Sequence, residues 1–379
     1  MYADVAAASR YTLVVGAGVN ANRHVPRWAE LVARAWDVVF HGENDYRPIS
    51  VERLVEARTA LQRHCNWTEE ETRRLDVPIH PLEPQLALEL IDLRLKESSD
   101  AADRVRKLVT DSRPRIAVAN TPVQHLLPVL LTRCLYENVV RGGASDTLSE
   151  LARFICRSKR LVRVISLNVD NLLELEVERT DPNRLEVISR QRHRVQTGIP
   201  TYHLHGFLPI DQLHDVPKWA QSRRSSRQGT KKTSQVREHS HEPVPEGVVF
   251  TDSQYWQSVA TPLSFANFVF ANALHDSSCI FIGLSMTDLN VIRWLGLSAT
   301  EFRREYEREF AVRGQWQFQA PNPYFRHCWI RPGTDDRTGF VEHFLAKRGV
   351  YTHAVENWGA KSVRGALGEL LEFDPKANA

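Results

Sequence analysis

The sequence lacks a cysteine framework that could hold a metal or a network of disulfides. Its 379 residues include only five cysteines, with no C-x-x-C pair: Cys65, Cys134, Cys156, Cys279 and Cys328. An odd number of scattered cysteines fits neither a disulfide scaffold nor a zinc site built from thiolates. We therefore expect a protein of the reducing cytoplasm, and no metal.

The chain also lacks a strong net charge, a long apolar run and a P-loop. Its formal net charge is +3, which by itself is too small to indicate a nucleic-acid ligand. The first apolar run, near the N-terminus, is far shorter than a signal peptide or a membrane span. We expect a cytoplasmic protein with no membrane segment.

One local stretch is strongly basic. Residues 222–237 (SRRSSRQGTKKTSQVR) carry six basic side chains and no acidic one, within a loop expected over residues 211–246. This basic loop could contact the phosphates of a nucleic acid, in a salt-dependent way, or could simply be solvated. The sequence leaves both alternatives open.

What the sequence does contain is an alternation of short β-branched runs with segments of helical period. Residues 11–15 predict a first strand, and a helix follows in which Pro26 takes the first helical position and apolar residues recur from Trp28 to Val39. Further strands are expected at residues 161–167, 201–205, 248–250 and 279–282. The pattern predicts an α/β fold, a Rossmann-like doubly wound and mainly parallel sheet.

Strand patterns disappear between the first helix and residue 160, where charged and leucine-rich stretches alternate. We interpret residues 41–159 as a helical insertion domain within a Rossmann domain formed by residues 1–40 and 160–379. Residues 323–330, 339–348 and 361–373 are expected to complete the Rossmann domain.

A glycine-rich turn follows the first predicted strand. Residues 16–21 (GAGVNA) match G-x-G-x-x-G/A, in which glycines let the backbone approach a pyrophosphate at a helix N-terminus. A turn that binds nothing is the alternative. Asp37 lies inside the helical pattern rather than at the end of a second strand, where a ribose-binding acid belongs. An ordinary dehydrogenase is therefore disfavoured.

Three later segments lie where an open α/β sheet places its ligand contacts, at the carboxyl ends of strands. They are residues 166–170 (SLNVD), 203–206 (HLHG) and 283–290 (GLSMTDLN). With the glycine turn and Pro26-x-Trp28, in this order, they resemble the motifs of the sirtuin superfamily, in the divergent branch found in bacterial antiphage defence.

The resemblance implies a site for NAD⁺ as substrate. Asn168, beside the ribose and the attacking water, and His205, as the base, would be catalytic. The remaining matched positions would contact NAD⁺: Gly16, Ala17, Gly18, Asn20, Pro26, Trp28, Asp170, Gly283, Ser285, Asp288 and Asn290.

Departures from the family pattern favour one activity within it. Asn20 replaces the usual serine, no arginine stands beside Trp28 as in deacetylating sirtuins, and no cysteine occurs between Gly206 and Ser278 to form their zinc module. We expect an NAD⁺ hydrolase that cleaves the nicotinamide–ribose bond to give nicotinamide and ADP-ribose, in antiphage defence by NAD⁺ depletion. An NAD⁺-dependent protein deacylase and a non-catalytic NAD⁺ or ADP-ribose sensing subunit are the alternatives.

Each of the main candidates also has a purely structural interpretation. Asn168 could cap a helix, and Asp170 could complement a helix dipole. His205 could be an ordinary strand residue, with His203, two positions earlier on the same strand face, as the fallback base. Ser285 and Asp288 match a capping box ahead of an apolar helix.

The resemblance further implies a homo-oligomer that works with a separate sensing partner, a HerA-like ATPase or a short Argonaute. The absence of a P-loop motif from the chain agrees with sensing by another protein. Trp67 and Tyr136, in the predicted insertion, could anchor a subunit interface. Burial within the insertion's own core is the competing interpretation for both residues, and for Tyr136 it is the favoured one.

Overall fold

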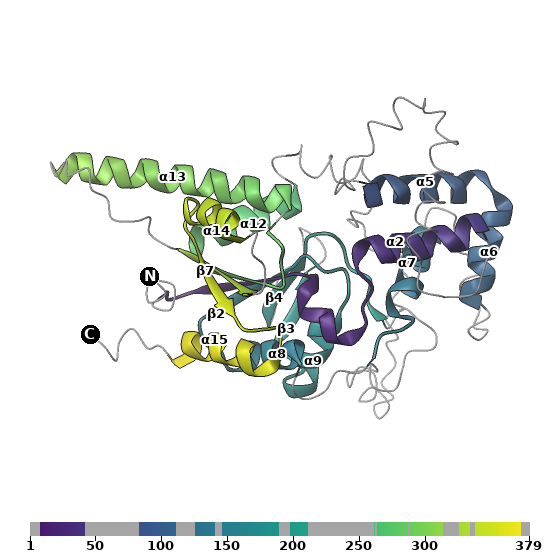
Figure 1. Cartoon of the computed structure of the whole chain (residues 1–379), viewed down its shortest axis with the longest axis horizontal. Coiled ribbons are helices and arrows are strands. Elements are labelled where there is room, and N and C mark those ends of the chain that lie inside the picture. The colour runs from purple at the N-terminus through teal and green to yellow at the C-terminus, as the bar shows by residue number, and fades with distance from the viewer. Residues whose placement is uncertain are drawn as a thin grey trace, which may run out of the picture.

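A computed structural model of the chain describes residues 8–41, 83–110, 126–140, 146–188, 198–210, 261, 264–286, 288–313, 326–333 and 338–372. It contains a seven-stranded, all-parallel sheet with helices on both faces (Figure 1). The predicted Rossmann-like, doubly wound α/β fold is therefore confirmed. The predicted strand at residues 248–250, the basic loop and Trp67 lie outside the described residues.

The strands follow the order β3-β4-β2-β1-β5-β6-β7 across the sheet. Their bounds are β1 (Tyr11–Val15), β2 (Leu161–Ser166), β3 (Leu185–Ile188), β4 (Ile199–His203), β5 (Ser278–Ile282), β6 (His327–Pro332) and β7 (Val350–Val355). After β4 the chain crosses to the other side of β1 and continues with β5. The carboxyl ends of β1 and β5 thus form the topological switch point, where open α/β sheets bind their ligands.

Side chains of the central strands alternate between two hydrophobic cores. In β1, Leu13 and Val15 face one core while Val14 faces the other, and Ile280 and Phe281 of β5 divide in the same way. Both faces of these strands are buried, which is why they form continuous apolar runs in the sequence. Each fully buried aliphatic or aromatic side chain contributes about 1.5–3 kcal/mol.

Helices cover the two faces in separate groups (Figure 1). One face carries α8 (Thr147–Arg157), α9 (Leu172–Thr180) and α15 (Ala360–Glu372), and the other carries α12 (Phe265–Asp276), α13 (Leu289–Arg313) and α14 (Thr338–Ala346). The predictions at residues 339–348 and 361–373 correspond to α14 and α15. The short β3 and the edge strand β7 were not predicted.

A third group of helices lies beside the sheet. It consists of α2 (Trp28–Trp36), the π-helical turn η2 (Asp37–His41), α5 (Glu83–Glu97), α6 (Ser99–Thr110) and α7 (Leu126–Tyr136) (Figure 1). Helix α2 packs against α5 and α7 although it precedes the predicted insertion, whereas α8, inside residues 41–159, packs against α9 and α15 of the sheet layer.

The connection from β1 into α2 differs from the prediction. A 3₁₀-helix, η1 (Ala17–Arg23), follows β1 directly, and α2 begins only at Trp28, with Arg27 at its N-cap. Pro26 is buried ahead of the helix, so the prediction that it occupies the first helical position is wrong. Asp37 ends α2, in the helical stretch where it was expected.

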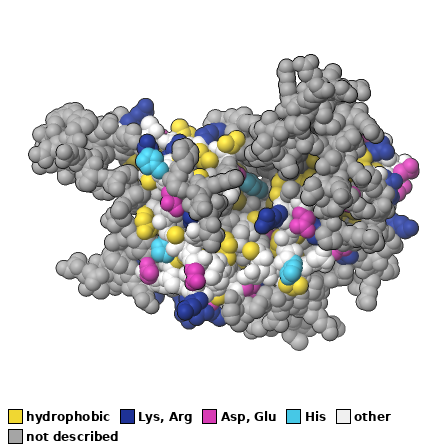
Figure 2. Space-filling view, viewed as in Figure 1, with side chains coloured by type: hydrophobic (Ala, Val, Ile, Leu, Met, Phe, Trp, Pro, Cys, Tyr) yellow, Lys and Arg dark blue, Asp and Glu magenta, His cyan; other side chains and the backbone are white. Residues whose placement is uncertain are grey.

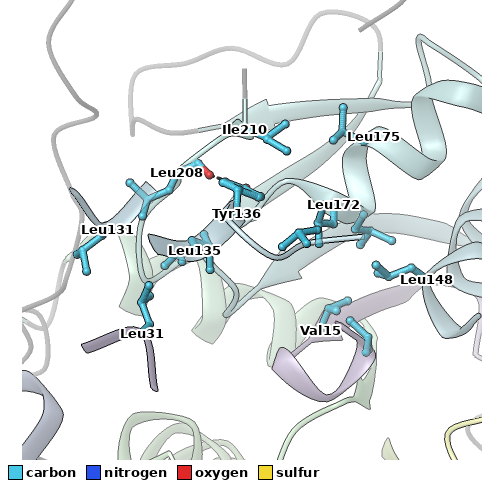
Figure 3. Packing of buried hydrophobic residues seen from close by; sticks show 14 of the residues in the cluster. Val15, Leu31, Leu131, Leu135, Tyr136, Leu148, Leu172, Leu175, Leu208 and Ile210 are labelled. Atoms are coloured by element: carbon cyan, nitrogen blue, oxygen red, sulfur yellow. Dashed lines mark hydrogen bonds between the residues drawn. The ribbon is translucent and has the colours of Figure 1, made fainter. Parts of the chain in front are cut away.

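Tyr136 belongs to the hydrophobic core that also contains Leu13 and Val15, called the main core below (Figure 3). Its side chain is buried, and its hydroxyl donates to the Leu208 carbonyl oxygen at 2.6 Å and accepts from the Asn171 backbone amide at 3.1 Å. The hydroxyl therefore joins the end of α7 to the segments that follow β2 and β4. Burial, the favoured interpretation for Tyr136, is therefore confirmed, and Tyr136 is not an exposed interface anchor.

The described surface is mixed in charge. On the face drawn in Figure 2, basic and acidic side chains lie interspersed among apolar ones. No helix in the described part of the chain combines the length and apolar character needed to cross a membrane.

Candidate functional site

The turns that follow β1, β2, β4 and β5 lie together at the carboxyl-terminal side of the sheet, because the ends of these four strands are aligned. Val15 of β1 pairs with both Ser166 of β2 and Ile282 of β5, and Ser166 pairs with His203 of β4. The three strand-end motifs and the glycine turn therefore leave the sheet side by side, at and beside the switch point. The parallel topology creates this convergence from segments that are distant in sequence.

The glycines of two of these turns contact each other. The backbone amides of Gly16 and Gly18 donate to the carbonyl oxygens of Ile282 and Gly283, at 2.9 and 2.8 Å. A Cβ on Gly16 would lie 2.6 Å from the Gly283 oxygen, and one on Gly283, whose φ is +72°, would lie 2.6 Å from the Val19 side chain. Close packing of the two turns is thus a sufficient reason for these glycines, whether or not a ligand binds. Ala17, between Gly16 and Gly18, is exposed.

Asn20 joins the glycine turn to the turn after β2. Its side-chain amide donates to Asp170 Oδ2 at 2.7 Å, and both residues are buried. Burial raises the pKa of Asp170 to about 6, against the opposing effects of the Leu172 amide, His203 and Asn20. The Asn20 Oδ1 atom is buried and finds no donor among the described residues.

Asn168 does not cap a helix. The N-cap of α9 is Asn171, and Asp170 accepts from the Leu172 amide at 3.1 Å, so Asp170 rather than Asn168 supports the start of this helix. The backbone of Asn168 is fixed by Ser166 Oγ and by the His203 ring. Within the described residues its side-chain amide makes no hydrogen bond, so the amide is available to a ligand.

The two histidines after β2 and β4 have different environments. Strand β4 ends at His203, so His205 lies in the following turn, and the prediction that both share one strand face is wrong. His203 is buried, with Nδ1 2.8 Å from the Asn168 carbonyl oxygen and Nε2 3.0 Å from Glu174 Oε1. Burial lowers the pKa of His203, but Glu174, the Asn168 carbonyl oxygen and Asp170 together outweigh this, and the net shift of the pKa is upward. With both nitrogens engaged, His203 is poorly suited as the base.

His205 instead faces Asp288. Its Nε2 lies 3.6 Å from Asp288 Oδ2, and its side chain is 31% exposed. Helix α13 begins at Leu289, and Asp288 Oδ1 accepts from the amides of Asn290 and Val291 at 2.8 and 3.1 Å. Asp288 is therefore itself the cap, and the predicted capping box with Ser285 as N-cap is wrong.

The remaining residues that were predicted to contact NAD⁺ have varied environments. Ser285 is exposed in the turn after β5, and the side-chain oxygen of Asn290 is buried without a donor in the described structure. Trp28, at the start of α2, is half-buried and packs against the main core.

Sequence reasoning missed a buried charge cluster next to this site. Arg23, at the end of η1, is almost fully buried and contacts Asp146 at 2.6 Å and Glu176 at 2.7 Å. Asp146 also caps α8, accepting from the Ser149 amide. Burial raises the pKa of Asp146, but the Arg23 guanidinium and the hydrogen bonds from Ser149 together outweigh this, so the net shift of the pKa is downward. Nothing in the local sequence distinguishes Arg23 from a surface arginine.

Chemically, the site offers an Asn168 amide that the described residues leave unpaired, an imidazole beside a carboxylate, and a glycine turn without bulky side chains at Gly16, Ala17 and Gly18. The described residues contain no cluster of three His, Cys, Asp or Glu side chains that could bind a metal ion. In comparisons with known proteins, no family model matches the chain, and no curated protein matches it.

Proposed function

We propose that the strand-end site binds NAD⁺ and hydrolyses its nicotinamide–ribose bond. The observation that carries this proposal is the convergence of the Asn168 amide and the His205–Asp288 pair at the switch-point edge of a Rossmann-like sheet. Dinucleotides bind at this edge in such folds, and glycosidic cleavage needs a group that orients water and a proton acceptor.

The reaction requires few protein groups. The bond between ribose C1′ and the nicotinamide nitrogen breaks, and its electron pair leaves with nicotinamide as a neutral molecule. Water bonds to C1′ and loses one proton, so the products are nicotinamide, ADP-ribose and H⁺. Because the leaving group is cationic in NAD⁺, positioning and exclusion of competing nucleophiles provide most of the catalysis.

Each side chain of the site has its own proposed role in this reaction. In the proposal the Asn168 amide orients the ribose and the attacking water, and His205 accepts the proton. The pyrophosphate lies against the turn formed by Gly16, Ala17 and Gly18, which has no large side chain. The buried, unpaired oxygens of Asn20 and Asn290 are acceptors that substrate hydroxyl or amide groups can satisfy.

The remaining contacts with NAD⁺ are proposed from the resemblance of the sequence motifs. The Asp170 carboxyl group is proposed to lie next to the nicotinamide amide, and Gly283 and Ser285 next to the substrate backbone. Pro26 and Trp28 are proposed to reach NAD⁺ from the α2 side.

The first prediction concerns nicotinamide release. Asn168→Ala and His205→Ala should each lower kcat at least about 100-fold, because each removes a group that acts on the reacting atoms, while the unfolding temperature stays within a few degrees. Chromatography of NAD⁺ reaction products measures this. His275→Ala is the matched control, because His275 is exposed at the end of α12, which leads into the opposite edge of the sheet.

Three outcomes separate the candidate functions. Full activity in both variants would overturn the site assignment. O-acyl-ADP-ribose formed only with an acylated peptide would indicate a deacylase, and NAD⁺ binding without products would indicate a sensing subunit.

The biological setting is part of the proposal. We propose that NAD⁺ depletion by this protein, as a homo-oligomer with a separate sensing partner, defends a bacterial cell against phage. A HerA-like ATPase and a short Argonaute are the proposed classes of partner, and light scattering on the isolated chain reports the oligomeric state.

A further inference from the structure

The contact between His205 and Asp288 bridges the candidate site. His205 follows β4 and Asp288 follows β5, and these strands are separated in the sheet by β2 and β1. Three strand spacings correspond to about 14 Å. The two turns therefore meet across the carboxyl ends of β2 and β1, at the edge where the Asn168 turn also leaves the sheet.

The two oxygens of Asp288 make different contacts. Oδ1 accepts from two backbone amides in the first turn of α13, which fixes the carboxylate on a long helix. Oδ2 lies 3.6 Å from His205 Nε2, within ion-pair distance and slightly longer than a hydrogen bond. A carboxylate anchored in this way can orient the partly exposed imidazole of His205.

We infer that Asp288 is a positioning residue for His205, and not a contact of NAD⁺. This inference rests on the proposed function. Asp288 favours the tautomer that carries its proton on Nε2, which leaves Nδ1 unprotonated to accept the proton of the attacking water. The same carboxylate stabilises the imidazolium formed when Nδ1 takes that proton.

If Asp288 acted only as the cap of α13, its variants would behave differently. Asparagine is as good an N-cap as aspartate, so Asp288→Asn preserves the bonds to the Asn290 and Val291 amides while removing the charge that faces His205. Asp288→Ala removes both the cap and the charge. Comparison of the two variants therefore separates the cap from the orientation of the imidazole.

The experiment measures kcat, KM for NAD⁺ and thermal unfolding of the full chain. Asp288→Asn should lower kcat about 10- to 100-fold, with KM within twofold of wild type and an unchanged unfolding temperature. Ser264→Ala is the matched control for cap loss, because Ser264 caps α12 by accepting from the Asn267 amide at 3.3 Å. It should lower the unfolding temperature and leave kcat unchanged.

A double-mutant cycle provides the decisive comparison. In a His205→Ala background, Asp288→Asn should cause no further loss of kcat, because the group that it positions is absent. NAD⁺ affinity, measured by calorimetry, should be unchanged in both backgrounds.

The failures of the two proposals are distinguishable. Wild-type protein that releases no nicotinamide would overturn the proposed function and the role of Asp288 with it. Active wild-type protein with full kcat in Asp288→Asn, or with weakened NAD⁺ affinity in this variant, would overturn the positioning role alone.

Discussion

At the scale of single residues, the buried polar groups around Asn168 have separate roles. His203 is saturated by the Asn168 carbonyl oxygen and Glu174, and it holds the backbone from which the Asn168 amide projects. Asp170 is linked to Asn20 and to the start of α9. Within the described part of the chain, the Asn168 side-chain amide thus has no hydrogen-bond partner, whereas both ring nitrogens of His203 are occupied.

Asp170 makes a pH-dependent contribution to stability. Its pKa rises from 3.8 to about 6 on folding because the carboxyl group is buried. The folded state thus favours the protonated form. The contribution of Asp170 to the free energy of unfolding is therefore highest below about pH 4. It falls as the pH rises to about 6 and is then constant, with a total loss of about 3 kcal/mol.

Asp170→Asn should remove this dependence, because the amide does not ionise. Its oxygen can still accept from the Leu172 amide, and its NH₂ group can donate to Asn20 Oδ1 once the Asn20 amide turns over. In urea denaturation the variant should gain stability relative to wild type between pH 4 and pH 6, and keep that gain at higher pH. Asp103→Asn is the control, since that carboxylate is 70% exposed and its replacement should have little effect at any pH. An identical difference between Asp170→Asn and wild type at pH 4 and pH 7 would contradict the prediction.

At the scale of elements, the turns after β1 and β5 act as one packed unit. Gly16, Gly18 and Gly283 permit backbone-to-backbone contact, and their amides and carbonyls bond across the switch point. Gly16 and Gly18 were predicted to approach a pyrophosphate, and Gly283 was predicted to contact NAD⁺. Their contact with each other is a sufficient structural reason for them, so they support a ligand site less strongly than the free amide of Asn168.

Gly283→Ala should therefore destabilise the protein by about 1–3 kcal/mol, through the positive φ and the clash with the Val19 side chain and the Gly16 oxygen. Gly365→Ala provides the matched control. In α15 a Cβ at this position meets nothing within 4 Å, so alanine should stabilise by about 0.5–1 kcal/mol. Chemical denaturation measures both, and equal effects would show that the two turns are not in close contact.

At the scale of the whole molecule, the Arg23 cluster connects parts of the chain that are distant in sequence. Arg23 lies on η1, Asp146 begins α8 and Glu176 lies on α9, and the Arg23 carbonyl oxygen also accepts from the Val140 amide. The cluster joins the turn after β1 to the helices that cover one face of the sheet. Its charges are almost completely removed from water.

Arg23→Ala should cost about 3–5 kcal/mol, because it leaves the Asp146 and Glu176 carboxylates buried without their main cation. Arg153→Ala is the control, since Arg153 is 41% exposed and its buried partner Glu150 keeps a two-point contact with Arg364, so the loss of Arg153 should cost at most about 1 kcal/mol. Urea denaturation compares the two variants. A small and equal loss in both would indicate that the Arg23 cluster opens to water.

The sequence by itself determined the fold class and placed the candidate residues at the carboxyl ends of strands. Strand and helix patterns are local, and the carboxyl ends of parallel strands lie on one edge, so Asn168 and His205 could be placed at that edge from their order alone. The exact ends of elements could not be fixed in this way. For this reason His205 was assigned to a strand and Asp288 to the wrong position of a cap.

Only the tertiary structure decided which side chains meet. Asn20 and Asp170 are 150 positions apart in the sequence, and Arg23 and Asp146 are 123 apart. No local period encodes such pairs. They arise because the strand order brings separate turns together, and because burial then makes every unpaired polar group costly. The contact of His205 with Asp288, across the ends of β2 and β1, has the same origin.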